Sequence, residues 1–223
     1  MLDHPHHNDN RDYDYSRFPD QERTEYAAII DLVAPNSRVA DLGCGNGALL
    51  SRLVEQKQVT GTGMDISESG IDLCRQRGLT VVLGSIDRPL PFRDDEFDVA
   101  ICNVTIQMVM YPEVLLREMK RIAQYQIVSF PNFAFWRNRI DLLCNGRMPR
   151  RMLFDYAWYS TGHIHQLSLT DFHELVEHVG GLRIVENRWD RSSNPVKNIL
   201  MQSFPNLFQM LGIYKLEKNN SLL

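Results

Sequence analysis

Residues 39–47 read Val39-Ala40-Asp41-Leu42-Gly43-Cys44-Gly45-Asn46-Gly47, a strand-like run that ends in a turn with three glycines. Glycine is needed where the backbone bends tightly or where a ligand must approach without meeting a Cβ atom. The following residues, 48–56, are compatible with a helix. A strand, a glycine-dense turn and a helix in this order predict a site for a nucleotide-like ligand.

The rest of the chain repeats this alternation of strand and helix. The expected strands are residues 37–42, 59–66, 79–83, 97–104, 126–130 and 182–189. The expected helices are residues 21–33, 48–56, 67–76, 112–122 and a helix that starts at Ser168. Such alternation implies parallel strands with crossover helices. We therefore predict an α/β, Rossmann-like fold with a mostly parallel central sheet and helices on both faces.

Charge and composition narrow the class of protein. The 223 residues include 24 Lys and Arg against 28 Asp and Glu, a net charge of −4, so no general attraction to nucleic acid or to anionic lipid is expected. No stretch is long and apolar enough for a membrane span, and residues 1–5 do not resemble a secretory signal. We expect a cytoplasmic protein whose partners are small molecules and proteins, with neither nucleic acid nor membrane among them.

The cysteines and histidines do not indicate a metal site. The four cysteines lie far apart with no CxxC motif (Cys44, Cys74, Cys102 and Cys144), which is typical of reduced thiols rather than of a zinc site or a disulfide framework. Histidines cluster at the N-terminus, but a flexible cluster lacks the supporting hydrogen bonds that orient metal ligands. No metal is expected.

We expect two unequal parts in the chain. Residues 1–20 carry five aspartates and hardly any aliphatic side chains, which predicts a flexible acidic arm. Residues 21–223 are expected to form a single domain. Within it, residues 132–162 form an aromatic and Arg-rich segment that is expected to cap the cleft.

Asp41 distinguishes between two ligands that the glycine turn would accept. The turn also satisfies the relaxed dinucleotide fingerprint, and Asp65 lies about 20 positions beyond it, where a ribose-binding acid is found. A carboxylate at the strand end would repel the pyrophosphate of a dinucleotide. S-adenosylmethionine has no phosphate and carries two cationic groups, which Asp41 favours.

The pattern from Asp41 to Gly47 resembles the first motif of class I S-adenosylmethionine-dependent methyltransferases. The resemblance implies that S-adenosylmethionine, or its product S-adenosylhomocysteine, lies against the turn, with Asp65 accepting both ribose hydroxyls. It also implies adenine contacts from the segment after the third strand and a cleft-facing residue at the end of the fourth. The expected cofactor-binding residues are Asp41, Gly43, Cys44, Gly45, Asp65, Ile66, Ser85, Ile86, Asp87 and Asn103. The family often has an acid at the position of Ser85, so the choice between Ser85 and Asp87 stays open.

Over residues 23–186 the chain resembles one family more closely, the methionine biosynthesis protein MetW family. The resemblance is carried by residues 37–50, 118–122, 128–133, 136–137, 146–149 and 158–159. Among these, Ser129-Phe130-Pro131-Asn132-Phe133 is not generic to methyltransferases. The resemblance implies a role in methionine biosynthesis together with a homoserine O-acyltransferase. The arm and the residues after about 187 match no motif of the family.

His165 is the candidate catalytic residue. It lies with His163 in an extended segment before the expected helix at Ser168, and alternate residues of such a segment share a face. His165 matches a family histidine, whereas the family tends toward Asn at the position of His163. Methyl transfer often needs only alignment of the reacting groups, so a structural histidine is an equally good interpretation.

Two classes of function fit these features. In the first, the chain is an accessory protein of methionine biosynthesis that binds S-adenosylmethionine and an acyltransferase. In the second, it is an enzyme that methylates a small metabolite. Residues 132–154 contain five arginines and one acidic residue, a composition that suits a docking surface for a partner enzyme as well as a lid over a substrate pocket. A nucleic-acid methyltransferase is disfavoured because Asn103-Val104-Thr105-Ile106 lacks the Pro-Pro-aromatic motif.

Overall fold

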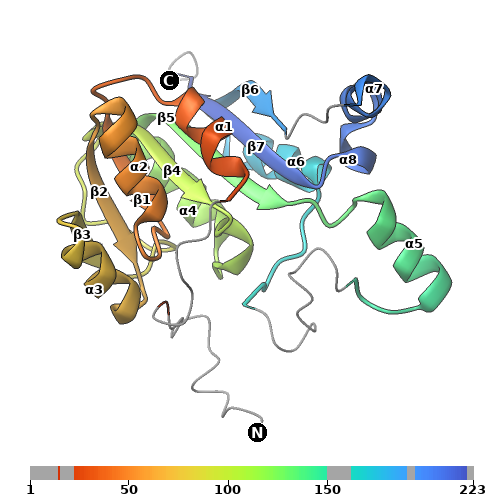
Figure 1. Ribbon diagram of the computed structural model, residues 1–223, viewed down its shortest axis with the longest axis horizontal. Coiled ribbons are helices and arrows are strands. Elements are labelled where there is room, and N and C mark those ends of the chain that lie inside the picture. Colours follow the sequence, from red (N-terminus) through yellow and green to blue (C-terminus); the bar gives the residue numbers. More distant parts are fainter. Residues whose placement is uncertain (1–14, 16–22, 150–161, 190–193, 220–223) are drawn as a thin grey trace, which may run out of the picture.

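The computed structural model describes residues 15, 23–149, 162–189 and 194–219. A seven-stranded sheet forms its centre, with the strand order β3-β2-β1-β4-β5-β7-β6 (Figure 1). The strands are β1 (Arg38–Leu42), β2 (Thr60–Asp65), β3 (Thr80–Leu83), β4 (Phe97–Asn103), β5 (Ala123–Pro131), β6 (Leu182–Arg188) and β7 (Leu211–Lys218). All six predicted strands are confirmed within a few residues at their ends.

The first five strands are parallel and the last two are not. β1 pairs in parallel with β2 and β4, β2 with β3, and β4 with β5. β7 inserts between β5 and β6 and is antiparallel to both. The predicted mostly parallel Rossmann-like sheet is therefore confirmed. Because the parallel strands share one direction, the carboxyl ends of β1, β2 and β4 lie at one edge of the sheet.

Helices cover both faces of the sheet. They are α1 (Glu25–Leu32), α2 (Ala48–Lys57), α3 (Glu68–Gln76), α4 (Pro112–Ile122), α5 (Trp136–Asn145), α6 (Leu169–Val179), α7 (Pro195–Ser203) and α8 (Pro205–Phe208), with a short 3-10 turn at Ile106–Met108. Two helix starts follow from local chemistry: Ser67 caps α3 by accepting from the N–H of Gly70, and Ser168 forms a capping box with Asp171 at α6.

Two apolar clusters attach the helices to opposite faces. One joins α1 and α2 to the sheet through side chains such as Ile29, Leu50 and Ile101. The other joins α4 and α6 to it through side chains such as Leu115, Phe172 and Val128. Ile101 and Val128 belong to strands buried on both faces, which is why β4 and β5 read as almost continuous apolar runs.

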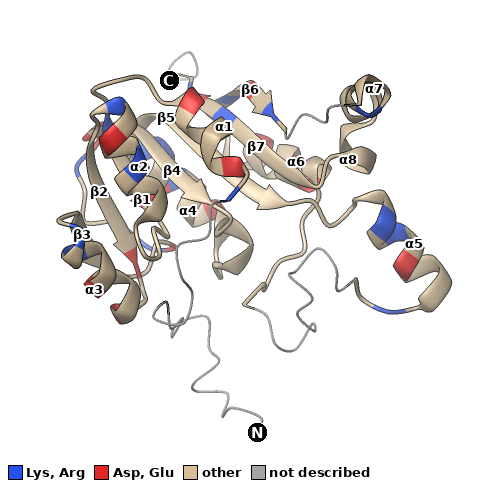
Figure 2. Cartoon of the chain, viewed as in Figure 1, with Lys and Arg blue, Asp and Glu red and all other residues tan. Residues whose placement is uncertain are grey.

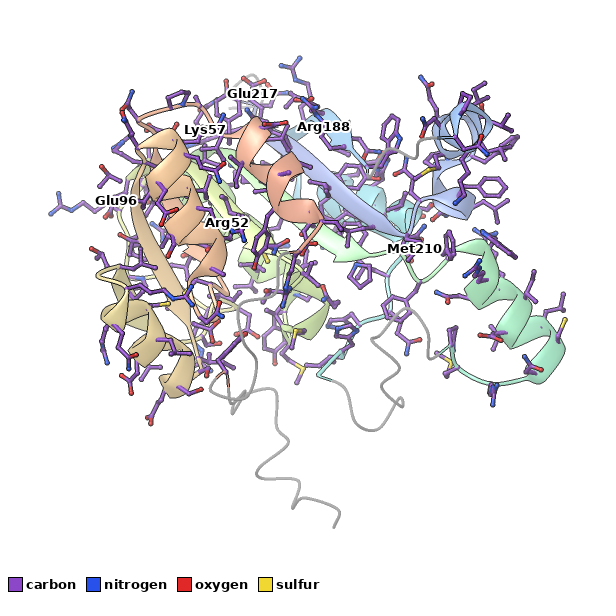
Figure 3. All side chains as sticks on the ribbon, in the orientation of Figure 1. Arg52, Lys57, Glu96, Arg188, Met210 and Glu217 are labelled. Atoms are coloured by element: carbon purple, nitrogen blue, oxygen red, sulfur yellow. The ribbon has the colours of Figure 1, made fainter. Side chains whose placement is uncertain are left out.

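A side chain of α2 also contacts a side chain of α1 directly. The guanidinium carbon of Arg52, labelled on α2 in Figure 3, lies 5.6 Å from the centre of the Tyr26 ring of α1. A cation over an aromatic face is weakly attractive at a surface. The contact adds to the apolar packing that holds α1 beside the helix that follows the glycine turn.

Four elements were not predicted. α5 lies inside the expected cap segment, and α7, α8 and β7 lie in the C-terminal part where no motif was found. Asn138 is the buried residue of α5, so the helix has no apolar stripe facing the core for periodicity to detect. β7 depends on partners distant in sequence, since it pairs with β5, about 90 residues earlier.

Several predictions fall outside the described residues. The proposed arm, residues 1–20, is described only at Tyr15, and Arg150, Arg151 and the aromatic residues at 154–159 of the cap segment are also outside. Within the part of the chain that the structure describes, no helix combines the length and apolar character that a membrane crossing needs.

Candidate functional site

The turn after β1 is held in place by backbone hydrogen bonds to β2. The N–H groups of Gly43 and Cys44 both donate to the carbonyl oxygen of Met64, at 2.7 and 3.1 Å. Gly43, Gly45 and Gly47 have φ angles of +80°, +54° and +76°, a region that side chains with a Cβ rarely adopt. Gly47 is also the residue that precedes α2. The sequence prediction of a tight turn leading into a helix is confirmed.

Asp41 lies buried beneath this turn. Its side chain is 1% exposed, and none of the described residues is a hydrogen-bond partner of its Oδ2 atom. Burial, with a smaller effect from the nearby charge of Asp65, raises the pKa of Asp41 to about 7. A buried acceptor with no donor is costly. The carboxylate would therefore be stabilised by a cationic or hydrogen-donating ligand.

Asp65 joins the end of β2 to two backbone segments. One carboxylate oxygen accepts from the N–H of Gly45 at 2.8 Å, and the other accepts from the N–H of Ser67 at 2.8 Å. Burial raises the pKa of Asp65, against the opposing effect of these N–H groups. Ile66, whose N–H also faces the Asp65 carboxylate, is half-buried. Asp65 thus has a structural role at the place where a ribose-binding acid was predicted.

The segment after β3 is tied to the loop before α4. Ser85 Oγ donates to Asp87 Oδ1 at 2.5 Å, and the N–H of Met110 donates to Asp87 Oδ2 at 2.9 Å. Burial opposes these bonds, but they hold the pKa of Asp87 below its ordinary value. Ile86 is 5% exposed and belongs to the core cluster of α4. Of the three predicted residues, Ser85 and Asp87 form one polar group and Ile86 packs inward.

Asn103, at the end of β4, forms hydrogen bonds through both the oxygen and the nitrogen of its side-chain amide. Its Oδ1 accepts from Ser129 Oγ at 2.5 Å, and its Nδ2 donates to Glu25 Oε1 at 3.5 Å. Ser129 is directly opposite Asn103 in the β4–β5 register. Ser129 and Glu25 were not among the predicted site residues, although Ser129 begins the family-specific Ser-Phe-Pro-Asn-Phe stretch. These contacts make Asn103 the link between β4, β5 and α1.

The loop after β4 contains a strained residue. Val104 has a φ of +49°, which a β-branched residue adopts only at a cost. The next residue, Thr105, reaches back over the turn, where its Cγ2 lies 2.6 Å from the position that a Cβ on Gly43 would occupy. Strain of this kind is concentrated at functional sites. The strain at Val104 could not be predicted from the sequence, because it is a property of the backbone dihedral angles.

The two histidines differ in their surroundings. His165 Nε2 lies 3.4 Å from the carbonyl oxygen of Met110, the residue whose N–H bonds Asp87. His163 is packed edge-on against Phe133, with its Nε2 3.5 Å from Gln107 Nε2. Burial lowers the pKa of His163 to about 4, so its ring is neutral near pH 7.

Gln107 lies in the same polar group as His163 and was not predicted from the sequence. Its Nε2 donates to the carbonyl oxygen of Val104 at 2.8 Å, which fixes the orientation of the amide. Its Oε1 is buried, and no residue in the part of the chain that the structure describes donates a hydrogen bond to it. The N–H groups of residues 164 and 165 both donate to its backbone oxygen, at 2.9 and 3.0 Å. The histidine segment is thereby attached to the loop after β4.

α5 carries the described part of the basic cap segment. Figure 2 shows basic and acidic positions on α5. The acidic residue of this helix is Asp141. Arg137 lies 5.2 Å from the Trp136 ring, and Arg139 donates to the carbonyl oxygen of Ala134 at 2.6 Å. Leu143 is 85% exposed. α5 therefore projects an apolar and basic surface instead of packing inward (Figure 1).

The predicted residues thus converge on one edge of the sheet, and their chemistry fits S-adenosylmethionine. Asp41, Gly43, Cys44, Gly45 and Asp65 surround the turn. Ser85 and Asp87 follow β3, and Asn103 is the last residue of β4. His165, in the segment before α6, lies beside Met110, whose N–H bonds Asp87. The unpartnered Asp41 oxygen suits a cationic ligand better than a pyrophosphate. No group of three or more His, Cys, Asp or Glu suited to a metal occurs among the described residues.

Comparison with known proteins defines the family. Residues 23–216 match the family described as methionine biosynthesis protein MetW. The chain belongs to the MetW family. A relative from Rhodopirellula baltica, described as bifunctional methionine biosynthesis protein MetXA/MetW, is 31% identical over 73% of this chain and 28% of its own length. The resemblance found in the sequence is therefore confirmed, and the family match extends beyond residue 186, where the resemblance was expected to end, to residue 216.

Other relatives match shorter parts of this MetW family member. A fatty-acid O-methyltransferase from Mycolicibacterium smegmatis is 39% identical over 38% of this chain and 32% of its own length. An uncharacterised protein from Methanocaldococcus jannaschii is 26% identical over 49% of this chain and 52% of its own length. The chain thus spans about a quarter to a half of the length of these relatives.

Solved structures confirm the class I methyltransferase fold. A S-adenosylmethionine-dependent methyltransferase from Mesorhizobium loti superposes with a TM-score of 0.65 at 17% identity, over 88% of this chain and 98% of that one. The [4+2]-cyclase SpnF superposes with a TM-score of 0.59 at 16% identity, over 86% of this chain and 80% of that one. A fold that includes a cyclase does not by itself establish methyl transfer.

Proposed function

We propose that this MetW family protein binds S-adenosylmethionine at the turn after β1 and acts in methionine biosynthesis together with a homoserine O-acyltransferase. The unpartnered, buried Oδ2 of Asp41 carries the cofactor part of the proposal. The ammonium and sulfonium groups of the cofactor supply the positive charge that this carboxylate lacks in the protein. When bound, the cofactor would supply an electrophilic methyl group.

The residues of the turn have distinct parts in this proposal. Gly43 and Gly45 let the backbone approach the ligand, and Cys44 between them lines the turn. Asp65 keeps lone pairs for the ribose hydroxyls while its bonds to Gly45 and Ser67 hold it in position. Ser85 and Asp87 offer polar contacts for the adenine.

The association with an acyltransferase is supported by the relative from Rhodopirellula baltica. Its description joins MetXA and MetW, and the matched region covers only 28% of its length. Two functions joined in one chain in one organism are good candidates for physical association in another. The exposed apolar and basic surface of α5 is compatible with such a partner.

A second function, methylation of a small metabolite, is favoured by a specific observation. Gln107 Oε1 is a buried acceptor that lacks a donor within residues 23–149, 162–189 and 194–219, and it lies close to a histidine that is neutral near pH 7. A hydroxyl or amine of a methyl acceptor would satisfy it. The relative described as a fatty-acid O-methyltransferase is compatible with this alternative.

Calorimetric titration and copurification test the two parts separately. S-adenosylhomocysteine should bind saturably and raise the melting temperature, because a ligand specific for the folded state stabilises it. A shift with a nicotinamide dinucleotide and none with either sulfur ligand would overturn the cofactor assignment. Copurification with the homoserine O-acyltransferase of the same cells, combined with a search for methylated products from labelled cofactor, separates the accessory role from the enzymatic one.

A further inference from the structure

Cys44 and Cys74 come from different elements and meet at one backbone atom. Cys44 lies in the turn after β1 and Cys74 in α3. Their sulfur atoms are 3.9 and 3.4 Å from the same carbonyl oxygen, that of Gly45. The two side chains are 8% and 0% exposed. Two buried thiols therefore lie next to the middle residue of the proposed cofactor turn.

Two glycines make room for these sulfur atoms. A Cβ atom on Gly47 would lie 2.8 Å from Cys74 Sγ, and a Cβ on Gly63 would lie 2.7 Å from Cys44 Sγ. Contacts this short are essentially never found for real Cβ atoms. The absence of side chains at 47 and 63 is thus a condition for placing both thiols under the turn.

The thiols also affect each other's ionisation. Hydrogen bonding between the two side chains, with burial as a smaller effect, raises the pKa of Cys44. The same hydrogen bond lowers the pKa of Cys74, against the opposing effect of burial. Because the thiolate is the reactive form, Cys74 is the more nucleophilic member of the pair.

We propose that Cys44 and Cys74 are a redox-active pair that a hydroperoxide converts into a disulfide across the turn. The Cys74 thiolate attacks one peroxide oxygen, the O–O bond breaks, and Cys74 becomes a sulfenic acid while hydroxide leaves. The Cys44 sulfur then attacks the Cys74 sulfur, the S–O bond breaks, and water leaves with the Cys44 proton. With hydrogen peroxide, two thiols lose two electrons and the peroxide becomes two waters.

Oxidation would change the proposed cofactor turn, a consequence that rests on the proposed function. A disulfide requires the sulfur atoms to be about 2.05 Å apart. Neither sulfur would then carry a proton to donate to the Gly45 carbonyl. Because the N–H of Gly45 bonds Asp65, pulling the turn toward α3 also disturbs the predicted ribose-binding acid. Oxidised protein should therefore bind S-adenosylhomocysteine at least tenfold more weakly.

The other two cysteines provide internal controls for thiol mapping. Cys102, in β4, is 0% exposed and Cys144, in α5, is exposed. The full chain is treated with hydrogen peroxide, unfolded, alkylated and digested, and the peptides are identified by mass spectrometry. We expect a cross-linked peptide pair containing Cys44 and Cys74, reversible by dithiothreitol, with Cys102 still alkylated. Alkylation of Cys44 and Cys74 at peroxide doses that fully oxidise Cys144 would overturn the proposal.

Variants and a titration complete the test. Cys74→Ser should abolish the cross-link. Cys102→Ser, the matched control, should leave the cross-link in place. Cys44→Ser serves as a second variant if Cys74→Ser folds poorly. Titration with S-adenosylhomocysteine before oxidation, after it, and after dithiothreitol then measures the effect on the turn. A disulfide with unchanged affinity would overturn the coupling to the cofactor. Failure of the reduced protein to bind would refute the proposed function but not the thiol pair, which the peptide map decides.

Discussion

The carboxylate of Asp65 accepts a hydrogen bond of 2.8 Å from the backbone N–H of Gly45, so the end of β2 holds the turn that follows β1. Both residues are predicted from the sequence to bind the same ligand. It also means that Asp65 contributes to the shape of the turn before any ligand is present. Mutations at this edge of the sheet should therefore affect folding and binding together.

Asp65→Ala should weaken both properties. We expect S-adenosylhomocysteine to bind about 1.5–3 kcal/mol more weakly, the range for hydrogen bonds to a charged group, and the free energy of unfolding to fall by about 2–4 kcal/mol as Gly45 and Ser67 lose their acceptor. Stability should fall together with affinity because Asp65 accepts these two backbone hydrogen bonds, which only the structure reveals. Titration calorimetry and urea unfolding measure the two effects.

Ser67→Ala is the matched control for Asp65. It removes the cap of α3 at a cost of about 1 kcal/mol but leaves the N–H group of Ser67 bonded to Asp65. Its affinity for the ligand should stay close to that of the wild type. An unchanged dissociation constant in Asp65→Ala would instead remove Asp65 from the site.

Asp41→Asn should stabilise the unliganded protein at high pH. Burial raises the pKa of Asp41 from 3.8 to about 7. As the pH rises from 4 to 7 the unfolded chain releases this proton and the folded protein retains it, so stability falls over this interval and stays low above it. Removing the acid should therefore increase the free energy of unfolding by on the order of 2–4 kcal/mol at pH 8.5, and by little at pH 4.5.

The same variant should bind S-adenosylmethionine more weakly at pH 8.5, since the carboxylate favours the cationic ligand. Unfolding measured at both pH values checks the stability effect. Asp72→Asn, an exposed partner of Arg75 on α3, is the control and should change stability by less than about 1 kcal/mol. Equal stability curves for Asp41→Asn and the wild type would contradict the assigned ionisation.

His163→Asn should flatten the acid side of the stability profile. Burial lowers the pKa of His163 from 6.5 to about 4. As the pH falls through 6.5 the unfolded chain takes up a proton that the folded protein does not, so wild-type stability decreases until about pH 4. The side chain is partly exposed, so we expect this loss to be about 1–2 kcal/mol between pH 7 and 4.5.

His165→Asn is the comparison that separates the two histidines. If His165 serves the methyl acceptor or the partner, its substitution should spare cofactor affinity and reduce turnover, or uncouple the response of the partner enzyme. Thermal unfolding between pH 4.5 and 8 and a cofactor titration are measured for both variants. Unchanged turnover and partner response, combined with a lower melting temperature, would leave His165 a structural residue.

Val104→Gly tests the strained loop after β4. The φ of +49° costs a β-branched residue about 1–2 kcal/mol, which glycine avoids. The variant should thus unfold within about 1 kcal/mol of the wild type, although it loses a half-buried side chain. Val99→Gly, a substitution of a buried residue in β4 itself, should cost at least about 2 kcal/mol more. Similar losses in both variants would show that no strain is relieved at Val104.

The sequence by itself determined where the parallel strands lie along the chain, the glycine turn and the helix starts at Ser67 and Ser168. These features depend on local chemistry: the period of apolar residues, the left-handed backbone that glycine permits, and side chains that satisfy the first N–H groups of a helix. The family could also be predicted from the sequence, because the glycine turn and the Ser-Phe-Pro-Asn-Phe stretch are each a continuous segment of the chain.

Only the tertiary structure decided which side chains meet. The antiparallel insertion of β7 depends on pairing with β5, and Cys74, Gln107 and Ser129 approach the site from elements separated by up to about 55 residues. Burial, which leaves Asp41 and Gln107 with unpartnered oxygens, is likewise a property of the assembled core. Propensity and spacing carry no information on such distances, so the hydrogen-bond partners of the predicted site residues emerge only when the chain is folded.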